Sequence, residues 1–294
     1  MSFAIESLWA QTFDTFEIIA IEGGSSDATG AILDSLVARS PIPMRVVHGS
    51  YSGPDMAMNA GAALASAPYL AFLNDDDAFH VDRLNAFARV INRCSDFAWG
   101  FSRVESIDEH GRPIAVSDIP DVAKRRALEL TRSPFESVRS MPVVNALVSS
   151  GNLVVKTELF KTLDGARDVR FRGWDLALRL LDLSEPFVVE RALYLDRTPP
   201  AKATRFSRNE DARASARALD HMYREYRDRL MPRHRFGPRV ADLGVGDNRP
   251  DDERAVHATL WALAKLRSVP LAYNAVRNSA RLTRRALAFR LRRR

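Results

Sequence analysis

AFLNDDDAFH, residues 71–80, runs a short apolar segment directly into Asn74 and three consecutive aspartates, whose like charges repel one another. Two explanations account for this pattern. The aspartates can bind a divalent cation, because Mg²⁺ and Mn²⁺ prefer carboxylate oxygens and are commonly held by one or two carboxylates together with substrate phosphates. Alternatively, the stretch is a polar loop in which Asp77 caps the next helix.

Apolar segments typical of strands alternate with amphipathic segments on both sides of this stretch. The predicted strands cover 16–24, 44–49, 69–73, 96–106 and 186–195, and another begins SSGNLVVKTELFKTLDG (149–165), which ends in a short helix closed by Gly165. The predicted helices cover 25–38, 55–67, 81–94, 174–183 and 207–230. Strands that alternate with helices of this length indicate βαβ units, and hence an α/β fold with a mostly parallel sheet.

Two acidic loops follow predicted strands of this sheet. Glu22–Asp27 comes after the first strand, and Asn74–Asp77 comes after the third. In such sheets ligands bind beyond the carboxyl ends of the strands, so we expect both loops on one rim. In the first loop, Ser26 or Asp27 is also a candidate N-cap of the helix that follows.

Composition indicates a globular protein. The chain has 294 residues, 46% of them hydrophobic and 27% charged, which is enough for a substantial core. One cysteine, Cys94, excludes an internal disulfide and is typical of a reducing compartment. We find no signal peptide and no apolar run long enough to span a bilayer, so the expected location is cytoplasmic.

The basic charge is concentrated at the C-terminus. The net charge is +6, with 43 Lys and Arg against 37 Asp and Glu, but eleven basic and no acidic residues follow Glu253. The preceding part therefore has 43 − 11 = 32 basic against 37 acidic residues, or −5. This argues against nucleic-acid binding. The tail has the pattern of a basic amphipathic helix, which predicts peripheral membrane contact or a partner-binding or solvated helix.

Several motifs, in the same order, resemble those of family 2 glycosyltransferases. ESLWAQTFDTFEIIAIEGGSSDATGAILD (6–34) is similar to the family's opening helix, strand and acidic loop. GPDMAMNAGAALASAPYLAFLNDDD (53–77) resembles the segment that ends in the family's metal-binding aspartates. The later stretch 149–165 and RGWDLALRL (172–180) are similar to the acceptor-side region. The resemblance covers residues 3–230.

This resemblance implies a GT-A fold and a nucleotide-diphosphate sugar donor, most commonly a UDP-sugar, with Mn²⁺ or Mg²⁺ as cofactor. It implies an inverting transfer to a glycan or lipid-linked acceptor, in which a carboxylate deprotonates the attacking hydroxyl. The expected domains are a glycosyltransferase-like domain over 1–230, a linker over 231–253 and a basic helical tail over 254–294.

The resemblance also assigns site residues. Asn74 and the two aspartates after it match the family's DXD positions, which makes Asp76 the best candidate metal ligand, supported by Asp75 and Asp77. Asp75 is also a candidate donor contact. The remaining candidates for donor binding are Glu22, Gly24, Asp27, Asn59 and Gly61, although Gly61 can equally serve helix packing.

The chain departs from the family pattern in two places. The family begins with a strand before the first helix, and we expect the true start to lie upstream of Met1. The family's general base is the aspartate of an ED pair before a tryptophan, and Arg172 and Gly173 stand at those positions here. Asp175 is the nearest carboxylate and the candidate base, with Asp168 as an alternative. Asp175 can also be an acidic residue in the first turn of a helix.

These departures keep a second function open. A degenerate GT-A domain would bind a nucleotide sugar or a partner without turnover. A nucleotidyltransferase is a third possibility, but it would need a basic glycine-rich loop, and EGGSSDATG (22–30) contains no Lys or Arg.

Overall fold

The computed structural model describes most of the first 200 residues and one short segment after them. The described ranges are 1–51, 53–119, 122–130, 141, 144–168, 172–198 and 239–240. The chain divides into two compact units, Met1–Phe206 with Arg235–Asp242, and Ser207–His234 with Leu243–Arg294. Every described residue belongs to the first unit. The predicted helix over 207–230 and the basic tail therefore lie outside the described residues.

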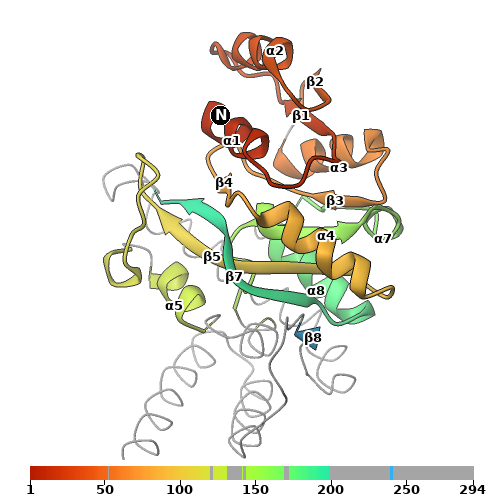
Figure 1. Ribbon diagram of the computed structural model, residues 1–294, viewed down its shortest axis with the longest axis vertical. Helices are drawn as coiled ribbons and strands as arrows, with labels where there is room; N and C mark the ends of the chain where they lie inside the picture. The colour runs from red at the N-terminus through yellow and green to blue at the C-terminus, as the bar shows by residue number, and fades with distance from the viewer. Residues whose placement is uncertain are drawn as a thin grey trace, which may run out of the picture. The chain divides into compact units, whose positions relative to one another are not determined.

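Helices and strands alternate along the first unit (Figure 1). The helices are α1 (Ser2–Trp9), α2 (Thr29–Arg39), α3 (Pro54–Leu64), α4 (Arg83–Arg93), α5 (Val122–Leu130), α7 (Thr157–Thr162) and α8 (Arg172–Leu183). The strands are β1 (Ile18–Glu22), β2 (Met44–His48), β3 (Tyr69–Ala71), β4 (Ala78–Phe79), β5 (Trp99–Ile107), β6 (Leu153–Lys156), β7 (Phe187–Arg197) and β8 (Arg239–Val240). Short 3₁₀ turns cover Val116–Asp118 and Ser150–Asn152.

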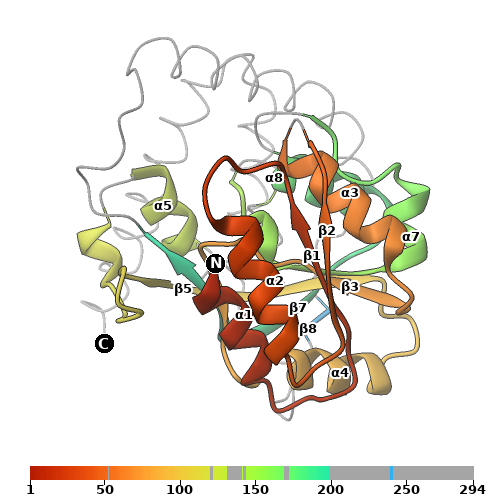
Figure 2. The same ribbon diagram turned by 90° about the horizontal axis from the view of Figure 1, so that it is seen from above.

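The strands form two sheets. β1 and β2 pair in parallel, with Glu22 opposite His48 at their carboxyl ends (Figure 2). The larger sheet has the order β3–β6–β5–β7–β4, and β8 pairs with β7. In that sheet the β5–β7 and β7–β8 pairs are parallel, whereas the β3–β6, β5–β6 and β4–β7 pairs are antiparallel. The prediction of a mostly parallel arrangement is therefore wrong for the larger sheet, which is mixed.

The acidic stretch is not the cap of a helix. Ala78 and Phe79 form β4 and pair with Leu195 and Tyr194 of β7. Helix α4 begins after this strand, with Asp82 at its N-cap position. The interpretation of Asp77 as an N-cap is therefore wrong, because a short strand intervenes between the aspartates and the helix.

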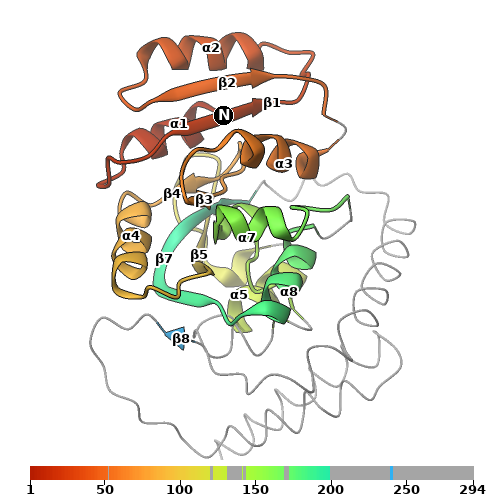
Figure 3. The same cartoon turned by 90° about the vertical axis from the view of Figure 1, so that its right-hand side faces the viewer.

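Two of the hydrophobic clusters of this unit are formed by described residues. Helix α2 packs against β1 and β2, and α3 packs against β1 (Figure 3). Leu33 and Leu36 of α2 are almost fully buried with Ile5 and Ile18 in the first cluster. The second cluster lies between α4 and the larger sheet, and its members are Phe87, Val90, Phe97, Val154, Phe187, Val189 and Leu193. Fully burying one such side chain contributes about 1.5–3 kcal/mol.

Two of the predicted helix boundaries have clear local causes. Pro54 occupies the first turn of α3, where a missing N–H costs nothing. The short helix α7 ends at Thr162, and the turn that closes it contains the predicted glycine: Asp164 and Gly165 have φ values of 55° and 67°, and the N–H of Gly165 donates to the carbonyl of Phe160 at 3.0 Å. Glycine reaches this left-handed conformation without steric cost.

Candidate functional site

The loop after β1 is organised by Glu22. Its side chain is buried, and Oε1 accepts hydrogen bonds from the backbone N–H of Gly24 at 2.9 Å and of Ser25 at 2.6 Å. The bonds from Ser25 are the main reason that the pKa of Glu22 lies below its usual range. Gly24 has a φ of 87°, and a Cβ there would lie 3.2 Å from the carbonyl oxygen of Gly49. The position therefore requires glycine.

Asp27 lies in the same loop and marks the start of α2. It is not the N-cap residue, which is Ala28, and neither is Ser26. Its Oδ1 nevertheless accepts a hydrogen bond from the N–H of Thr29 at 2.9 Å, and the bonds from Thr29 lower the pKa of Asp27. The carboxylate is exposed, so a ligand at this loop could still reach it.

Asn59 and Gly61 of α3 make contacts within the protein. The Asn59 amide donates to the carbonyl of Ala166 at 2.8 Å and accepts from its N–H at 2.8 Å. This pair of bonds ties α3 to the loop after α7. A Cβ on Gly61 would lie 3.4 Å from the Ile21 side chain, so the glycine allows α3 to approach β1 closely.

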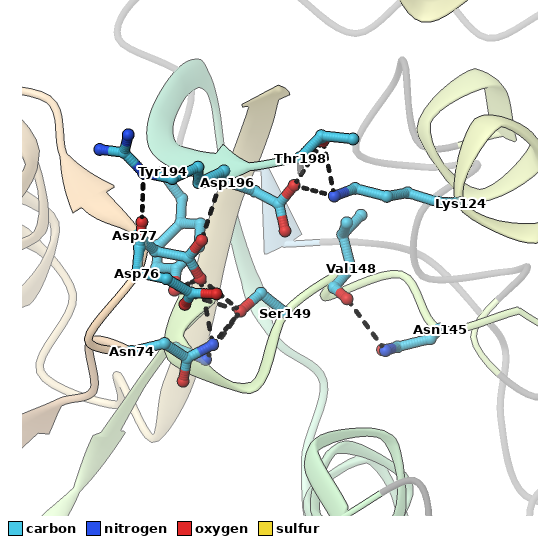
Figure 4. A network of polar contacts seen from close by, with 12 residues as sticks. Asn74, Asp76, Asp77, Lys124, Asn145, Val148, Ser149, Tyr194, Asp196 and Thr198 are labelled. Atoms are coloured by element: carbon cyan, nitrogen blue, oxygen red, sulfur yellow. Dashed lines mark hydrogen bonds and ion pairs between the residues drawn. The ribbon is translucent and has the colours of Figure 1, made fainter. Parts of the chain in front are cut away.

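Asp77 is the centre of a buried hydrogen-bond network (Figure 4). Its Oδ2 accepts from the Tyr194 hydroxyl at 2.5 Å, from the Asn74 amide at 3.0 Å and from the Ser149 hydroxyl at 3.2 Å. Its Oδ1 accepts from the N–H of Arg197 at 2.9 Å. Burial, with the nearby charge of Asp196, raises the pKa of Asp77. Both oxygens are thus engaged in holding the loop.

Asp75 and Asp76 are different, because both residues are exposed overall, although the Asp76 carboxyl is partly shielded from solvent. The loop holds Asp76 through its backbone, whose carbonyl accepts from the Arg197 guanidinium at 2.8 Å. Partial burial raises the pKa of the Asp76 carboxyl, and the charges of Asp77 and Asp75 raise it further. In the part of the chain that is described, no three His, Cys, Asp or Glu side chains are grouped to hold a metal ion. Asp75 and Asp76 fit a cation that substrate phosphates complete, rather than one held by the protein alone.

Asp196 is a buried carboxylate that the sequence analysis missed. It lies near the end of β7, forms an ion pair with Lys124 of α5, and lies 3.5 Å from the Thr198 hydroxyl (Figure 4). Burial raises the pKa of Asp196, and Lys124 opposes that effect. In the sequence Asp196 comes directly after the mostly apolar run 186–195, much as the aspartates come after the run 69–73, and this pattern could have identified it.

A strained turn leads to Ser149. Val148 has a φ of 64°, and the N–H of Ser149 donates to the carbonyl of Leu147 at 2.7 Å. A γ-turn of this hand is rare, and a β-branched residue at positive φ is a genuine outlier. Strained backbone of this kind clusters at functional sites. The turn presents Ser149 to Asn74 and Asp77, which joins this loop to the acidic stretch.

Arg83 packs against Tyr194, which belongs to the same network. Its side chain is fully buried, and it donates to the Ser102 hydroxyl at 2.6 Å and to the Asn152 carbonyl at 2.9 Å. The guanidinium lies 4.7 Å from the centre of the Phe79 ring and 5.3 Å from that of Tyr194. Burial lowers the pKa of Arg83 to about 9.

The candidate base, Asp175, lies in the first turn of α8 and is almost fully buried. Its Oδ2 is 2.9 Å from the Arg179 guanidinium, one turn further along the helix. Arg179 also donates to the carbonyls of Leu163 and Gly165. Its other oxygen, Oδ1, is 3.9 Å from the half-exposed Arg167 guanidinium, so the contacts described for Asp175 are ion pairs with two arginines. Asp168, the alternative, is exposed.

The structure does not bring all the predicted site residues together. The loop after β1 belongs to the two-stranded sheet, whereas the aspartates follow β3 of the larger sheet. Among the described residues, no hydrogen bond or ion pair joins Glu22–Asp27 to Asn74–Asp77. Their placement on one rim stays a prediction. In the same described part, no helix combines the length and apolar character needed to cross a bilayer.

Two solved structures have folds similar to that of this chain. Staphylococcus aureus TarS 1–349, solved in complex with UDP-GlcNAc, superposes with a TM-score of 0.54 at 15% identity, over 78% of this chain and 66% of that one. A mannosyltransferase from Pyrobaculum calidifontis, PcManGT, solved with GDP-Man and Mn²⁺, gives a TM-score of 0.50 at 15% identity, over 98% of this chain and 75% of that one. The predicted GT-A fold is thereby confirmed.

Sequence comparison identifies the family. The model of "Glycosyl transferase family 2" matches residues 2–148, half of the chain. The chain belongs to glycosyltransferase family 2. It is 31% identical over 111 residues to an uncharacterized glycosyltransferase of Rickettsia felis, covering 38% of this chain and 18% of that protein. It is 37% identical over 107 residues to the succinoglycan biosynthesis protein ExoO of Rhizobium meliloti, covering 36% and 28%. The match thus spans less than a third of either curated relative.

Proposed function

We propose that this protein transfers a sugar from a nucleotide-diphosphate donor to a glycan or lipid-linked acceptor. The observation that carries the proposal is the contrast between two neighbouring aspartates in a chain of this family. Asp77 is buried and fixes the loop, whereas Asp76 is exposed beside it and has a raised pKa. The neighbouring carboxylates disfavour the charged form of Asp76. A divalent cation, bound together with the phosphates of the donor, would relieve this repulsion, so the loop suits a site of that kind.

The residues proposed to hold a divalent cation are Asp76 and Asp75. Asp77, the third predicted ligand, would act through the loop rather than by direct contact, because both of its oxygens already accept hydrogen bonds. Neutralising the charge on the departing nucleoside diphosphate is the chemistry that Mn²⁺ or Mg²⁺ supplies in such a site.

The donor nucleotide is proposed to lie against the loop after β1. Glu22 would hold that loop through its hydrogen bonds to the backbone, with Gly24 at the turn and Asp27 at its exposed end. Asn59 would keep α3 in place beside it. TarS has been solved with UDP-GlcNAc and PcManGT with GDP-Man, so UDP and GDP are the nucleotides to test first.

The proposed reaction is an inverting displacement. The acceptor hydroxyl oxygen bonds to the anomeric carbon, the bond from that carbon to the phosphate oxygen breaks, and the hydroxyl proton passes to a carboxylate. Asp175 is the base predicted from the sequence, and that role stays a prediction. The cytoplasmic location and membrane contact through residues 254–294 are also predictions, and that tail lies outside the described residues.

Calorimetric titration with UDP and with GDP tests the proposal. Each titration is made with Mn²⁺ and with EDTA, on the wild type, on Asp76→Asn, and on Asp14→Asn as a control. Asp14 is an exposed carboxylate ahead of β1, at the opposite end of that strand from the loop. We expect Mn²⁺-dependent binding that Asp76→Asn weakens at least about tenfold, which corresponds to about 1.4 kcal/mol. Equal binding by Asp76→Asn would remove Asp76 from the site.

A second function, nucleotide-sugar binding without turnover, is favoured by one observation. Asp175 is almost fully buried and pairs with Arg179, so its carboxylate is directed to that guanidinium and not to an acceptor hydroxyl. Incubating the wild type with UDP-GlcNAc or GDP-Man, with and without an added glycan or lipid-linked acceptor, and measuring nucleotide release distinguishes the two functions. Release supports the transferase, whereas tight binding without release supports the binding protein. No nucleotide binding at all would contradict both.

A further inference from the structure

His48 lies between two carboxylates at the carboxyl ends of β1 and β2. Its Nε2 is 2.9 Å from Oδ1 of Asp34 on α2, and its Nδ1 is 3.6 Å from Oε2 of Glu22 on β1. Glu22 and His48 are also direct partners in the parallel pairing of the two strands. The imidazole thus joins three elements at one point: α2, β1 and β2.

Glu22 connects this imidazole to the loop. One carboxylate oxygen of Glu22 faces His48, and the other accepts the N–H groups of Gly24 and Ser25. The side chain of Glu22 is only 8% exposed. Because it accepts both of these N–H groups, its orientation fixes the path of the backbone after β1. If the imidazole no longer holds Oε2, the carboxylate can rotate and both loop hydrogen bonds weaken.

The charge on His48 depends on the same two neighbours. The hydrogen bond with Asp34 is the main reason that the pKa of His48 lies above its usual value, and Glu22 adds to the effect. Asp34 and Glu22 are the charged groups with the largest effects on this pKa. An imidazolium donates from both nitrogens, whereas a neutral imidazole donates from only one. At 3.6 Å the approach of Nδ1 to Glu22 is longer than a hydrogen bond, so it is an ion-pair contact that attracts fully only while His48 is protonated.

We propose that His48 is a positioning residue of the donor site, an imidazolium that ties Glu22 to Asp34 and holds the Gly23–Asp27 loop in shape for the nucleotide. The inference rests on the proposed function, since it assumes that a nucleoside diphosphate binds this loop. It adds a residue that the family motifs do not include. It also gives nucleotide affinity a pH dependence, because affinity falls as pH rises and His48 loses its proton.

Two measurements on the full chain test the inference. The His48 Cε1–H resonance is followed by NMR from pH 5 to 9, and the Kd of UDP with Mn²⁺ is measured over the same range. We expect His48 to titrate above the ordinary histidine value of about 6.5. We expect UDP affinity to fall about tenfold across that titration, within the usual range of coupling between two sites. His48→Gln should bind weakly at every pH and should keep only the pH dependence that comes from the nucleotide itself.

The controls separate His48 from other sources of pH dependence. His110→Gln removes an exposed histidine in the turn after β5, and it should keep the wild-type profile, which also contains the titration of the nucleotide itself. Asp34→Asn keeps His48 but removes its nearest carboxylate, so the fall in affinity should move to lower pH. This variant also serves if His48→Gln fails to fold.

Different failures point to different errors. A wild-type pH profile in His48→Gln, or an unshifted His48 resonance, would overturn the inference while leaving the donor site in place. If Asp34→Asn leaves the pH profile of UDP affinity unchanged, His48 does not link Asp34 of α2 to Glu22 of β1. If the wild type binds neither UDP nor GDP at any pH, the proposed function fails, and this inference fails with it.

Discussion

Asp77 and Asp76 are adjacent in the chain, but Asp77 is buried and Asp76 is exposed. Asp77 is covered by Tyr194, Ser149 and Arg197, which come from β7 and from the loop before β6. No local pattern could have separated the two, because the hydroxyl that binds Asp77 lies 117 residues further along the chain. The sequence located the acidic loop correctly, but only tertiary contacts divide it into an anchor and an exposed carboxylate.

Asp76→Asn should stabilise the protein at neutral pH when no metal or nucleotide is present. Burial and the charges of Asp77 and Asp75 raise the pKa of Asp76, so the folded state binds its proton more tightly than the unfolded state. The wild type therefore loses stability as pH rises from the ordinary value through the raised one. The variant avoids that loss. After solvent screening we expect a gain of at most about 1 kcal/mol, or roughly 2–4 °C in Tm.

Thermal unfolding in EDTA at pH 4 and pH 7.5 measures this effect. The difference between Asp76→Asn and the wild type should be small at pH 4 and should grow at pH 7.5, whereas Asp14→Asn should show no such growth. A variant that is less stable than the wild type at pH 7.5 would show that Asp76 contributes to the fold, not to a site under electrostatic repulsion.

At the scale of single elements, the position of α8 was predicted well, but the contacts that its side chains make were not. The apolar spacing of WDLALRLLDL identified the helix, and Asp175 and Arg179 stand four residues apart, which allows them to pair on one face. The spacing does not indicate that the pair is buried. That depends on the loop after α7, whose carbonyls at Leu163 and Gly165 also accept from Arg179.

Asp175→Ala should destabilise the protein by about 3–5 kcal/mol, because it leaves the Arg179 guanidinium buried without its counter-charge. Urea unfolding measures the loss, and Glu158→Ala on the exposed first turn of α7 is the control, with an expected change of about 0.5 kcal/mol or less. If Asp175→Ala keeps wild-type stability and abolishes sugar transfer, the carboxylate serves as the base and its ion pair is incidental.

At the scale of the whole molecule, the order of elements was predictable and the strand directions were not. Hydrophobic periodicity identified β1, α2, β2, α3, β3, α4 and β5 with ends within a few residues of those observed, but it missed the short strand β4, and the opening helix α1 came only from the family resemblance. Periodicity says nothing about which strands become neighbours. β6 enters between β3 and β5 and runs antiparallel to both, so the larger sheet is mixed. The βαβ pattern applies to β1, α2 and β2, where the crossover helix is short and local.

Strand β8 provides a test of the predicted boundary at residue 230. Arg239 and Val240 pair in parallel with Phe187 and Val188 of β7 and cover part of that strand's edge. A chain that ends at residue 230 loses this strand, whereas one that ends at residue 242 keeps it. Both lack residues 243–294, so the comparison isolates the segment from 231 to 242. At about 0.5–1.5 kcal/mol per hydrogen bond, we expect the shorter chain to be less stable by roughly 1–3 kcal/mol. Urea unfolding of the two chains measures the difference, and equal stability would mean that β8 contributes nothing and that the domain ends at residue 230 as the sequence predicts.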